Sequence, residues 1–381
     1  MMTYNYQKSN RYFAQCAEDI KDIVEDELLS FGAAEISEGY KGVYFNAGLE
    51  ALYRVNYNTA LINRVLAPLF SFDCHSENYL YKTAYDIEWE NLFDINKTFA
   101  VFASVQQSAV NHSKFAALKL KDAIVDRFRD RTGKRPSVDT RNPDLWLNLH
   151  ILNNHAVISL DTSGGSLHRR GYRKESVEAP MIETLAASII KLSGWKGEQP
   201  LYDPFCGSGT LLCEAYLHLT ETPPALLRDK FGFEILPDFD KKIWNRVKNE
   251  SKKKIKKIDE GFIAGSDAAK LAVKNAAINC KQIDRHNKIS LRQTNIFDIK
   301  ELKDTTIVCN PPYGIRMKKN ADLSDFYKSF GDFLKQRCTG SKAYVYFGDR
   351  AYLKKIGLKA KWKRPLQNGG LDGRLAKFEL Y

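Results

Sequence analysis

The sequence predicts an α/β protein whose C-terminal half is a doubly wound parallel sheet and whose N-terminal part consists of smaller α+β domains. From Gly197 onward, short apolar strands alternate with helical patterns, which is typical of such a sheet. A Gly-x-Gly turn at Gly207 and Gly209 follows the first of these strands. With 381 residues, the chain is also too long for one hydrophobic core. The predicted domains comprise residues 1–65, 66–165 and 166–381.

The composition favours a polyanionic partner. The formal net charge is +12, and aromatic residues, which can stack on bases, make up 12% of the chain. A basic soluble protein without such a partner is the plain alternative. The seven cysteines are scattered and form no C-x-x-C pair, which indicates a reducing compartment and no zinc site. The N-terminus has no apolar signal segment and no long apolar run occurs, so we expect a cytoplasmic protein without membrane attachment.

The first domain carries no recognisable chemistry. Strands are predicted at residues 12–14 and 42–45, with a helix at 19–31 between them. A further helix is expected over residues 48–65.

The second domain contains a candidate RNA-binding helix. A strand at 98–105 precedes a helix that we expect the Ser113 hydroxyl to cap. Phe115, Leu118, Ile124 and Phe128 are expected on its apolar face. Its other face is rich in Lys and Arg, a layout suited to phosphate contact. Interspersed aspartates leave open that this face is only solvated. Two strands joined at Asn153-Asn154 follow.

Residues 162–182 combine glycines with four cations and predict a linker that faces a phosphate or another ligand. His168 has no partner at metal-ligand spacing, so a structural or RNA-contacting role is expected. Pro180 is expected to open a helix over residues 182–192.

The loop from Asp203 to Thr210 is the candidate cofactor loop. Its two glycines let a ligand approach the backbone closely, and the helix that follows offers free N–H groups to a carboxylate. No Gly-Lys follows, which excludes a phosphate-binding P-loop. Asp203 would repel a pyrophosphate but bind an ammonium group. The loop therefore suits the amino-acid end of S-adenosylmethionine.

The next strands supply the rest of this site. The strand at 261–267 ends on Asp267, which can bind both ribose hydroxyls. The strand at 289–295 leaves Asn295 and Asp298 near the adenine. Between the loop and these strands lies a long insertion, 222–260, whose lysine run from Lys252 is most simply a solvated helix face, with RNA contact as the alternative.

The stretch Asn310-Pro311-Pro312-Tyr313 ends the strand 306–309 and has the parts needed to methylate an exocyclic amine. The Asn310 oxygen and the Pro311 carbonyl can each accept one N–H, which turns the nitrogen lone pair toward a methyl donor. Tyr313 would stack on the base. For the tripeptide alone, a strand-ending turn is an equally good interpretation.

Together these motifs resemble class I amino-methyltransferases. The segments 105–119 and 167–180 also look like the THUMP-containing RNA methyltransferases, most similar to the ribosomal large-subunit methyltransferase L group, which makes N2-methylguanosine in 23S rRNA. The resemblance implies a ferredoxin-like unit, a THUMP domain and a Rossmann-like domain that uses S-adenosylmethionine without a metal. Thr294-Asn295 departs from the Gly-Asp of many relatives, so either Asn295 or Asp298 could contact the adenine. Some relatives carry a second methyltransferase domain, which this chain lacks, so one modification is expected.

The candidate residues implied by the motifs and the resemblance fall into three groups. The catalytic residues are Asn310, Pro311, Pro312 and Tyr313. The cofactor-binding residues are Asp203, Phe205, Cys206, Gly207, Ser208, Gly209, Thr210, Asp267, Ala268, Asn295, Asp298 and Asn310. The RNA-binding residues are Lys114, Lys119, Lys121, Arg169, Arg170 and Arg173.

The expected partner is RNA, 23S rRNA or a large-subunit precursor, without an obligate protein partner. A tRNA guanine-N2 methyltransferase, a DNA adenine-N6 methyltransferase and a non-catalytic RNA-binding assembly factor are the alternatives. We also expect RNA binding and methyl transfer to be separable by a cut at about residue 165.

Overall fold

The computed structural model describes residues 3–176, 180–313 and 320–381. The chain divides into two compact units, which we call unit 1 and unit 2. Unit 1 comprises Met1–Tyr57, Ile62–Leu167 and Arg228–Lys248. Unit 2 comprises Asn58–Leu61, His168–Leu227 and Asn249–Tyr381.

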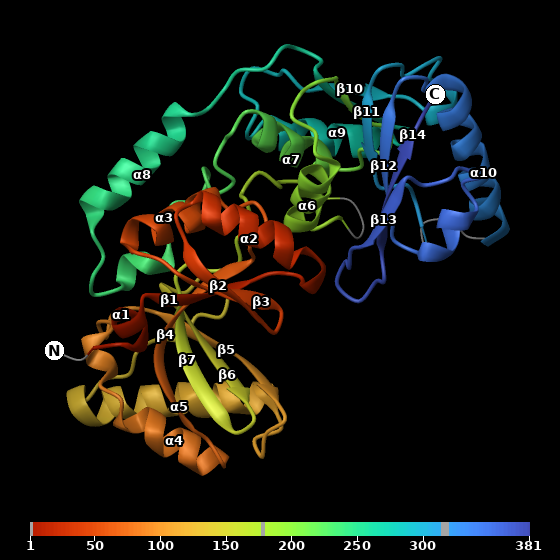
Figure 1. Ribbon diagram of the computed structural model, residues 1–381. Helices are drawn as coiled ribbons and strands as arrows, with labels where there is room; N and C mark the ends of the chain where they lie inside the picture. The colour runs from red at the N-terminus through yellow and green to blue at the C-terminus, as the bar shows by residue number, and fades with distance from the viewer. Residues whose placement is uncertain (1–2, 177–179, 314–319) are drawn as a thin grey trace. The chain divides into compact units, whose positions relative to one another are not determined.

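Unit 1 is built on one seven-stranded sheet with the order β2-β3-β1-β4-β7-β6-β5 (Figure 1). All neighbours pair antiparallel except β5 and β6, which are parallel. The strands are β1 (Arg11–Gln15), β2 (Ala34–Gly39), β3 (Gly42–Asn46), β4 (Arg64–Asp73), β5 (Phe99–Gln106), β6 (Leu145–Leu152) and β7 (His155–Asp161). The helices are α1 (Asn5–Ser9), α2 (Lys21–Ser30), α3 (Leu49–Asn58), α4 (Glu77–Asp86) and α5 (Ser113–Thr132).

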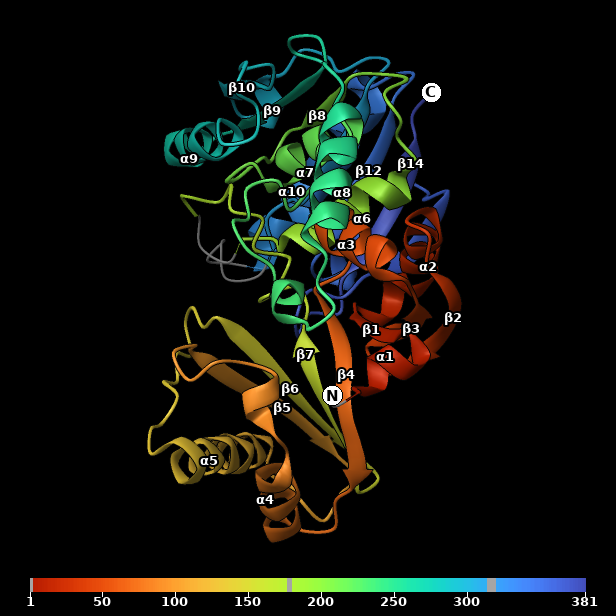
Figure 2. The same cartoon turned by 90° about the vertical axis from the view of Figure 1, so that its left-hand side faces the viewer.

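Alternation along the strands gives this sheet one covered face. Tyr12 and Ala14 of β1, like Leu147 and Leu149 of β6, are buried, whereas their neighbours in sequence point to the opposite face. Figure 2 shows α4 and α5 on one side of β4, β7, β6 and β5. The opposite face of these strands is not covered by α4 and α5.

The structure confirms the predicted hairpin of β6 and β7 and corrects the helix expected over residues 48–65. Asn153 and Asn154 adopt the positive φ angles, 51° and 60°, that a tight hairpin turn requires. Helix α3 ends at Asn58 because the chain then pairs with β1 as strand β4, which places Val65 opposite Ala14. Strands β2 and β4 and helix α4 were not predicted.

The chain returns to unit 1 after residue 227, which sequence patterns did not indicate. Tyr53 and Tyr57 of α3 pack against Phe231, Phe233 and Trp244, with ring centroids 4.5–6.2 Å apart. The segment Arg228–Lys248 therefore completes the core of unit 1. A cut at residue 165 would remove this segment, so the structure argues against the simple separation that the sequence suggested.

Unit 2 contains a second seven-stranded sheet, with the order β10-β9-β8-β11-β12-β14-β13. The first five strands are parallel, and β14 runs antiparallel to β12 and β13. The strands are β8 (Leu201–Asp203), β9 (Ile263–Asp267), β10 (Ser290–Gln293), β11 (Thr306–Cys309), β12 (Lys342–Phe347), β13 (Trp362–Pro365) and β14 (Arg374–Glu379). The helices are α6 (Glu183–Ser193), α7 (Thr210–Leu219), α9 (Lys270–Cys280) and α10 (Asn320–Arg337). Helix α8 (Lys241–Lys253) belongs to unit 1 up to Lys248 and to unit 2 from Asn249.

One detail of this unit differs from the expectation, and one lies beyond what the structure describes. Helix α6 begins at Glu183 with Ile182 as its N-cap, so Pro180 precedes the helix and does not lie in its first turn. Ala179, which belonged to the resemblance, lies outside the described residues.

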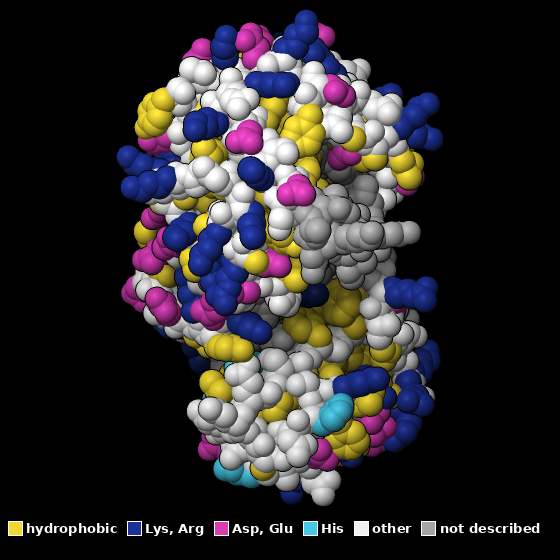
Figure 3. All heavy atoms as spheres, turned by 90° about the vertical axis from the view of Figure 1, so that its right-hand side faces the viewer, with side chains coloured by type: hydrophobic (Ala, Val, Ile, Leu, Met, Phe, Trp, Pro, Cys, Tyr) yellow, Lys and Arg dark blue, Asp and Glu magenta, His cyan; other side chains and the backbone are white. Residues whose placement is uncertain are grey.

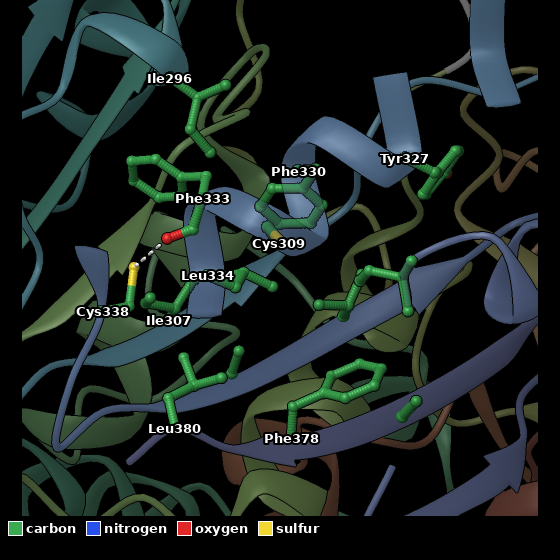
Figure 4. Packing of buried hydrophobic residues seen from close by; sticks show 14 of the residues in the cluster. Ile296, Ile307, Cys309, Tyr327, Phe330, Phe333, Leu334, Cys338, Phe378 and Leu380 are labelled. Atoms are coloured by element: carbon green, nitrogen blue, oxygen red, sulfur yellow. Dashed lines mark hydrogen bonds between the residues drawn. The ribbon is translucent and has the colours of Figure 1, made fainter. Parts of the chain in front are cut away.

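An apolar core between α10 and the sheet fixes the end of β11 (Figure 4). Phe330 and Leu334 of α10 are fully buried in one cluster with Ile307 and Cys309 of β11. All seven cysteines of the chain are buried and none forms a disulfide. No described helix combines the length and apolarity that crossing a membrane would require.

Candidate active site

The parallel strands of unit 2 bring the two main sequence motifs together. β8 lies between β9 and β11, and the chain leaves β8 and β11 at the same edge of the sheet, at Asp203 and Asn310. The strand order reverses at this pair, and ligands of doubly wound sheets bind in the crevice that forms there. Asp203 and Asn310 line one narrow cavity of about 40 Å³. The two motifs, 107 residues apart in the sequence, thus form one site.

The loop after β8 needs its second glycine for two reasons. Gly209 has a φ of +83°, which side chains rarely adopt. A Cβ at this position would also lie 3.1 Å from Ala276 Cβ and 3.3 Å from Cys280 Sγ of helix α9. Gly209 therefore lets the start of α7 pack closely against α9. The sequence also predicts that this glycine lets a ligand approach the backbone closely, and that role stays a prediction.

Asp203 is a buried carboxyl group in this cavity. Only 1% of the residue is exposed, and Oδ1 accepts a hydrogen bond from the Phe205 amide at 3.0 Å. Burial is the main cause that raises the pKa of Asp203 to about 8; the hydrogen bond from the Phe205 amide opposes this rise, and the charge of Asp267 adds to it. The carboxyl group is therefore neutral at pH 7 unless a cation binds beside it.

Asp267 connects the cofactor loop to β9. Its two carboxylate oxygens accept hydrogen bonds from the Gly207 amide at 3.0 Å and from the Ala269 amide at 2.9 Å. Each oxygen keeps a lone pair for a further donor. The geometry fits the expected contact with two ribose hydroxyls, and Ala268, which lies between the bonded residues, is exposed.

Asn310 carries an acceptor that the protein does not use. Its Oδ1 atom is buried and has no hydrogen-bond partner among the residues that the structure describes. The Pro312 carbonyl, by contrast, accepts the hydroxyl of Tyr327 at 3.2 Å. A buried polar atom without a partner costs about 1–3 kcal/mol, so the retention of one here indicates a group that bonds to a ligand.

Tyr313 is half-buried against the end of β12. A Cβ on Gly348 would lie 2.4–2.5 Å from three atoms of the Tyr313 ring, so only glycine leaves room for the ring there. On the other side of the loop, Phe205 packs edge-on against Phe326 and Phe330 of α10, with centroids 5.7 and 5.2 Å away. Local packing thus holds the rings of Phe205 and Tyr313 next to the cavity residues Asp203 and Asn310.

The adenine end of the predicted site is more exposed. Asn295 caps the short helix Ile296–Asp298 through a bond from the Phe297 amide to its Oδ1 at 3.1 Å. Asp298 is exposed, as is the Phe297 ring, which packs against Phe326. The contact of Asn295 or Asp298 with the adenine stays a prediction.

Arg170 was expected to bind RNA, and the structure shows that it does not face solvent. The residue is 2% exposed, and its guanidinium group donates to Glu214 Oε1 and to the carbonyls of Thr59 and Ala60. Burial raises the pKa of Glu214, which also accepts the Tyr172 hydroxyl at 2.8 Å. Arg170 is therefore part of the core of unit 2.

Arg173 was also expected to bind RNA, but it braces the cofactor loop. Its guanidinium group donates to Glu183 Oε1 at 2.8 Å, to Ser208 Oγ at 3.3 Å and to Thr210 Oγ1 at 3.1 Å. Burial opposes ionisation of Glu183, but hydrogen bonds from His168 and the charge of Arg173 lower its pKa below the ordinary value. With its donors engaged by the protein, Arg173 has a supporting role that its charge alone did not reveal.

Asn279 of α9 supports the same loop, and sequence reasoning missed it. Its Oδ1 accepts the amides of Lys174 and Glu175, while Nδ2 donates to the carbonyls of Glu175 and Ser208 at 2.8 and 2.9 Å. No sequence pattern marked this residue, because the tertiary partners of an asparagine within a helix cannot be read from its neighbours in the sequence.

The structure confirms part of the predicted apolar face of helix α5 and corrects its cap. His112, and not Ser113, caps it, since Nδ1 of His112 accepts the Phe115 amide at 3.3 Å. Ser113 Oγ instead accepts the Val105 amide. Of the four residues expected on the apolar face, Ile124 and Phe128 are buried, whereas Phe115 and Leu118 are 40% and 47% exposed.

The predicted RNA-binding lysines remain near this exposed side. Lys114 is exposed, Lys119 lies over the Phe115 ring at 5.3 Å, and Lys121 pairs with Asp122. Arg169 is exposed as well. Figure 3 shows Lys and Arg side chains spread over the face that it presents, with carboxylates between them. RNA contact by these four residues stays a prediction.

The described residues contain no group of three or more His, Cys, Asp or Glu side chains that could hold a metal ion. The cavity offers two hydrogen-bond acceptors, the Asp203 carboxyl group and the Asn310 amide oxygen. They suit an ammonium group and an N–H donor.

Comparison with known families matches three successive regions of the chain. The ferredoxin-like domain described for RlmL matches residues 11–66, and the THUMP domain matches residues 74–161. The methyltransferase domain described as RMKL-like matches residues 170–377.

Known proteins resemble the chain over nearly its whole length. A putative RNA methyltransferase of Synechocystis sp. is 39% identical over 371 residues, which cover 97% of each protein. The ribosomal RNA large subunit methyltransferase K/L of Syntrophotalea carbinolica is 36% identical over 97% of this chain and 53% of its own length, so the present chain spans about half of that relative. A crystal structure of a putative methyltransferase complexed with SAH has a TM-score of 0.84 at 28% identity and covers 98% of both chains.

Proposed function

The chain belongs to the RMKL-like methyltransferases, and we propose that it transfers a methyl group from S-adenosylmethionine to the exocyclic N2 amine of a guanine in 23S rRNA. The name of the Syntrophotalea relative supports a large-subunit ribosomal RNA as the substrate. The matched THUMP domain supports RNA as the partner. Such an enzyme would act in the cytoplasm on the ribosomal RNA or its precursor.

The observation that carries this proposal is the unpartnered Oδ1 of Asn310 in one cavity with Asp203. Asp203, held neutral by burial, gains its charge when an ammonium group binds beside it. Asn310 Oδ1 then offers a buried acceptor that still needs an N–H donor. The two groups can therefore bind the cofactor amine and the target amine side by side.

Asn310 and Pro311 supply orientation. An amine on a nucleobase is a weak nucleophile because its lone pair is delocalised into the ring. Asn310 Oδ1 and the Pro311 carbonyl, which accepts no hydrogen bond from a described residue, would each accept one N–H and thereby aim the lone pair. Bound S-adenosylmethionine supplies a methyl group already activated by the sulfonium sulfur. The N–C bond forms as the S–C bond breaks, and the amine then loses one proton to water.

Tyr313 would hold the target base. An amine inside a helix is shielded by stacking, so the guanine must be unpaired or flipped out at a cost of a few kcal/mol. Stacking on Tyr313, whose ring Gly348 positions, would recover part of this cost.

Mass-spectrometric nucleoside analysis of rRNA, tRNA and DNA from a deletion strain tests the proposal. Loss of one N2-methylguanosine from 23S rRNA, restored by the wild-type gene but not by Asn310→Ala, is the expected result. Loss of N2-methylguanosine from tRNA, or of N6-methyladenine from DNA, would assign the alternative substrates. Unchanged nucleosides together with no binding of S-adenosylmethionine in calorimetry would point to a non-catalytic assembly factor.

A further inference from the structure

The open face of the sheet in unit 1 is hollowed into a cavity of about 630 Å³. Its lining comes from β1, β3, β4, β5, β6 and β7 and from the adjoining loops, all within unit 1. The alternation is regular: His150 of β6 and Val157 of β7 line the cavity, whereas Ile151 and Ile158 are buried on the opposite face. The volume lies in the range of about 300–1,000 Å³ that ligand sites occupy.

The floor of the cavity holds two polar side chains that the protein leaves unpaired. Asn148 of β6 and Ser159 of β7 face each other across the ladder and are 3% and 4% exposed. The side chains of both line the cavity, and neither makes a hydrogen bond to another described residue. Their polar atoms therefore remain open to a ligand or to water that enters the cavity.

One wall is an aromatic pair that two glycines accommodate. The rings of Phe13 and Tyr44 lie 4.8 Å apart at 56°. A Cβ on Gly39 would lie 2.7 Å from the Phe13 ring, and a Cβ on Gly42 would lie 2.5 Å from it. Any side chain at Gly39 or Gly42 would displace the Phe13 ring, so the two glycines are required for this wall.

The charge of the lining is one-sided. Among the described residues that line the cavity there is no Asp or Glu, while Arg11 and Lys41 stand at the aromatic wall. The Arg11 guanidinium lies 5.0 Å from the centroid of the Tyr44 ring. His150 bonds to Ser104 Oγ at 2.8 Å, and burial lowers its pKa. His155 pairs with Asp73, which stands outside the lining.

We propose that this cavity binds an unpaired segment of the substrate RNA, an inference that rests on the proposed function. The Phe13–Tyr44 wall stacks a base, Asn148 and Ser159 bond to a base edge or a ribose hydroxyl, and Arg11 and Lys41 contact phosphates. A flat solvated sheet face would need none of these features. The residues that line this cavity are separate in the sequence from the residues proposed to transfer the methyl group.

Binding of a 12-nucleotide single-stranded RNA of mixed sequence to the full-length protein, without cofactor, tests this proposal by fluorescence anisotropy. Tyr44→Leu should weaken the affinity about 5- to 150-fold, the range for loss of one stacked base. Tyr79→Leu removes an exposed tyrosine of α4, outside the cavity, and serves as the matched control. Ultraviolet cross-links should map to peptides that contain Phe13 or Tyr44.

Asn148→Val adds a readout that separates binding from folding. Removing an unpaired amide that faces the cavity should leave the melting temperature unchanged or raise it, while RNA affinity falls about tenfold. Equal affinity of wild type, Tyr44→Leu and Asn148→Val would overturn the proposal. Guanosine monophosphate binding as tightly as the oligonucleotide would also overturn it, in favour of a small-anion site.

The two proposals can fail separately. Should the deletion strain lose no methylated nucleoside while Tyr44→Leu still weakens RNA binding, the proposed reaction fails and the RNA site stands. Should methylation be lost in the deletion strain while both cavity variants keep wild-type affinity and KM for RNA, the RNA site alone fails.

Discussion

Replacing Asn310 by alanine should separate stability from catalysis. Asn310 Oδ1 is buried without a partner, so its removal relieves a desolvation cost of about 1–3 kcal/mol. The lost packing of a few side-chain atoms costs a similar amount, at about 0.8 kcal/mol for each buried CH2-sized group. We therefore expect the free energy of unfolding to change by less than about 1 kcal/mol. The rate of methyl transfer should fall about 10²- to 10³-fold, because one oriented acceptor for the target amine is gone.

The matched control is Asn56, a fully buried asparagine whose amide group is satisfied. Asn56 Nδ2 donates to the Leu52 carbonyl at 2.9 Å, and its Oδ1 accepts the Ser163 hydroxyl at 2.8 Å. Asn56→Ala leaves these partners unpaired and should cost about 2–4 kcal/mol.

Urea unfolding measures the stability of both variants, and single-turnover transfer of labelled methyl to rRNA measures the chemical step. Calorimetry should give Asn310→Ala nearly wild-type affinity for S-adenosylmethionine. The reasoning would be refuted by an Asn310→Ala protein that is destabilised as much as Asn56→Ala, or by one that keeps most of its methyl-transfer rate.

Four further outcomes are expected. Asp267→Ala should weaken binding of S-adenosylmethionine by about 1.5–3 kcal/mol in calorimetry, and unchanged affinity would remove Asp267 from the site. Cofactor affinity should rise up to tenfold per pH unit between pH 6 and about 8, because Asp203 must lose its proton to pair with an ammonium group; calorimetry in two buffers should show proton release that Asp203→Asn abolishes. Arg170→Met should cost about 3–5 kcal/mol in urea unfolding because Glu214 loses its buried partner, while RNA affinity of the folded protein stays unchanged; selective loss of RNA affinity would contradict this. Reversing three lysines of α5 to Glu should raise the KM for RNA far more than it lowers kcat, and a wild-type KM at physiological salt would show that they are only solvated. These are Lys114, Lys119 and Lys121.

Residues whose role follows from local backbone geometry could be placed from the sequence. Gly209 has a positive φ, which glycine adopts readily. The hairpin turn requires positive φ angles at two residues, and Asn153 and Asn154 adopt them. Asp203 and Asn310 follow directly after apolar strands, and parallel strands bring their carboxyl ends to one edge. The strand order of unit 2 turned these local patterns into a common site.

Charged residues could not be placed in the same way. Arg170 and Arg173 lie in one basic stretch, but their tertiary partners decide their roles: Glu214 holds the first in the core, and Glu183 with Ser208 directs the second to the cofactor loop. A guanidinium group that pairs inside the protein has the same sequence signature as one that contacts a phosphate.

The helix α5 shows the same limit for apolar residues. Phe115 and Leu118 fit the predicted period, yet they are exposed near its start, and Ala116 and Leu120 face the core instead. Propensity and spacing set the helix, whereas the sheet beneath it decides which side is covered.

The return of Arg228–Lys248 to unit 1 has a consequence during synthesis on the ribosome. The ribosome must add 81 residues between Leu167 and Lys248 before unit 1 is complete in sequence. At about 5–20 residues per second, that interval lasts about 4–16 s. Until Phe233 and Trp244 are added near its end, Tyr53 and Tyr57 of the nascent chain lack these aromatic partners. Unit 1 therefore cannot finish folding before residues 168–227 of unit 2 have been translated, and its exposed aromatic surface is a target for chaperones until then.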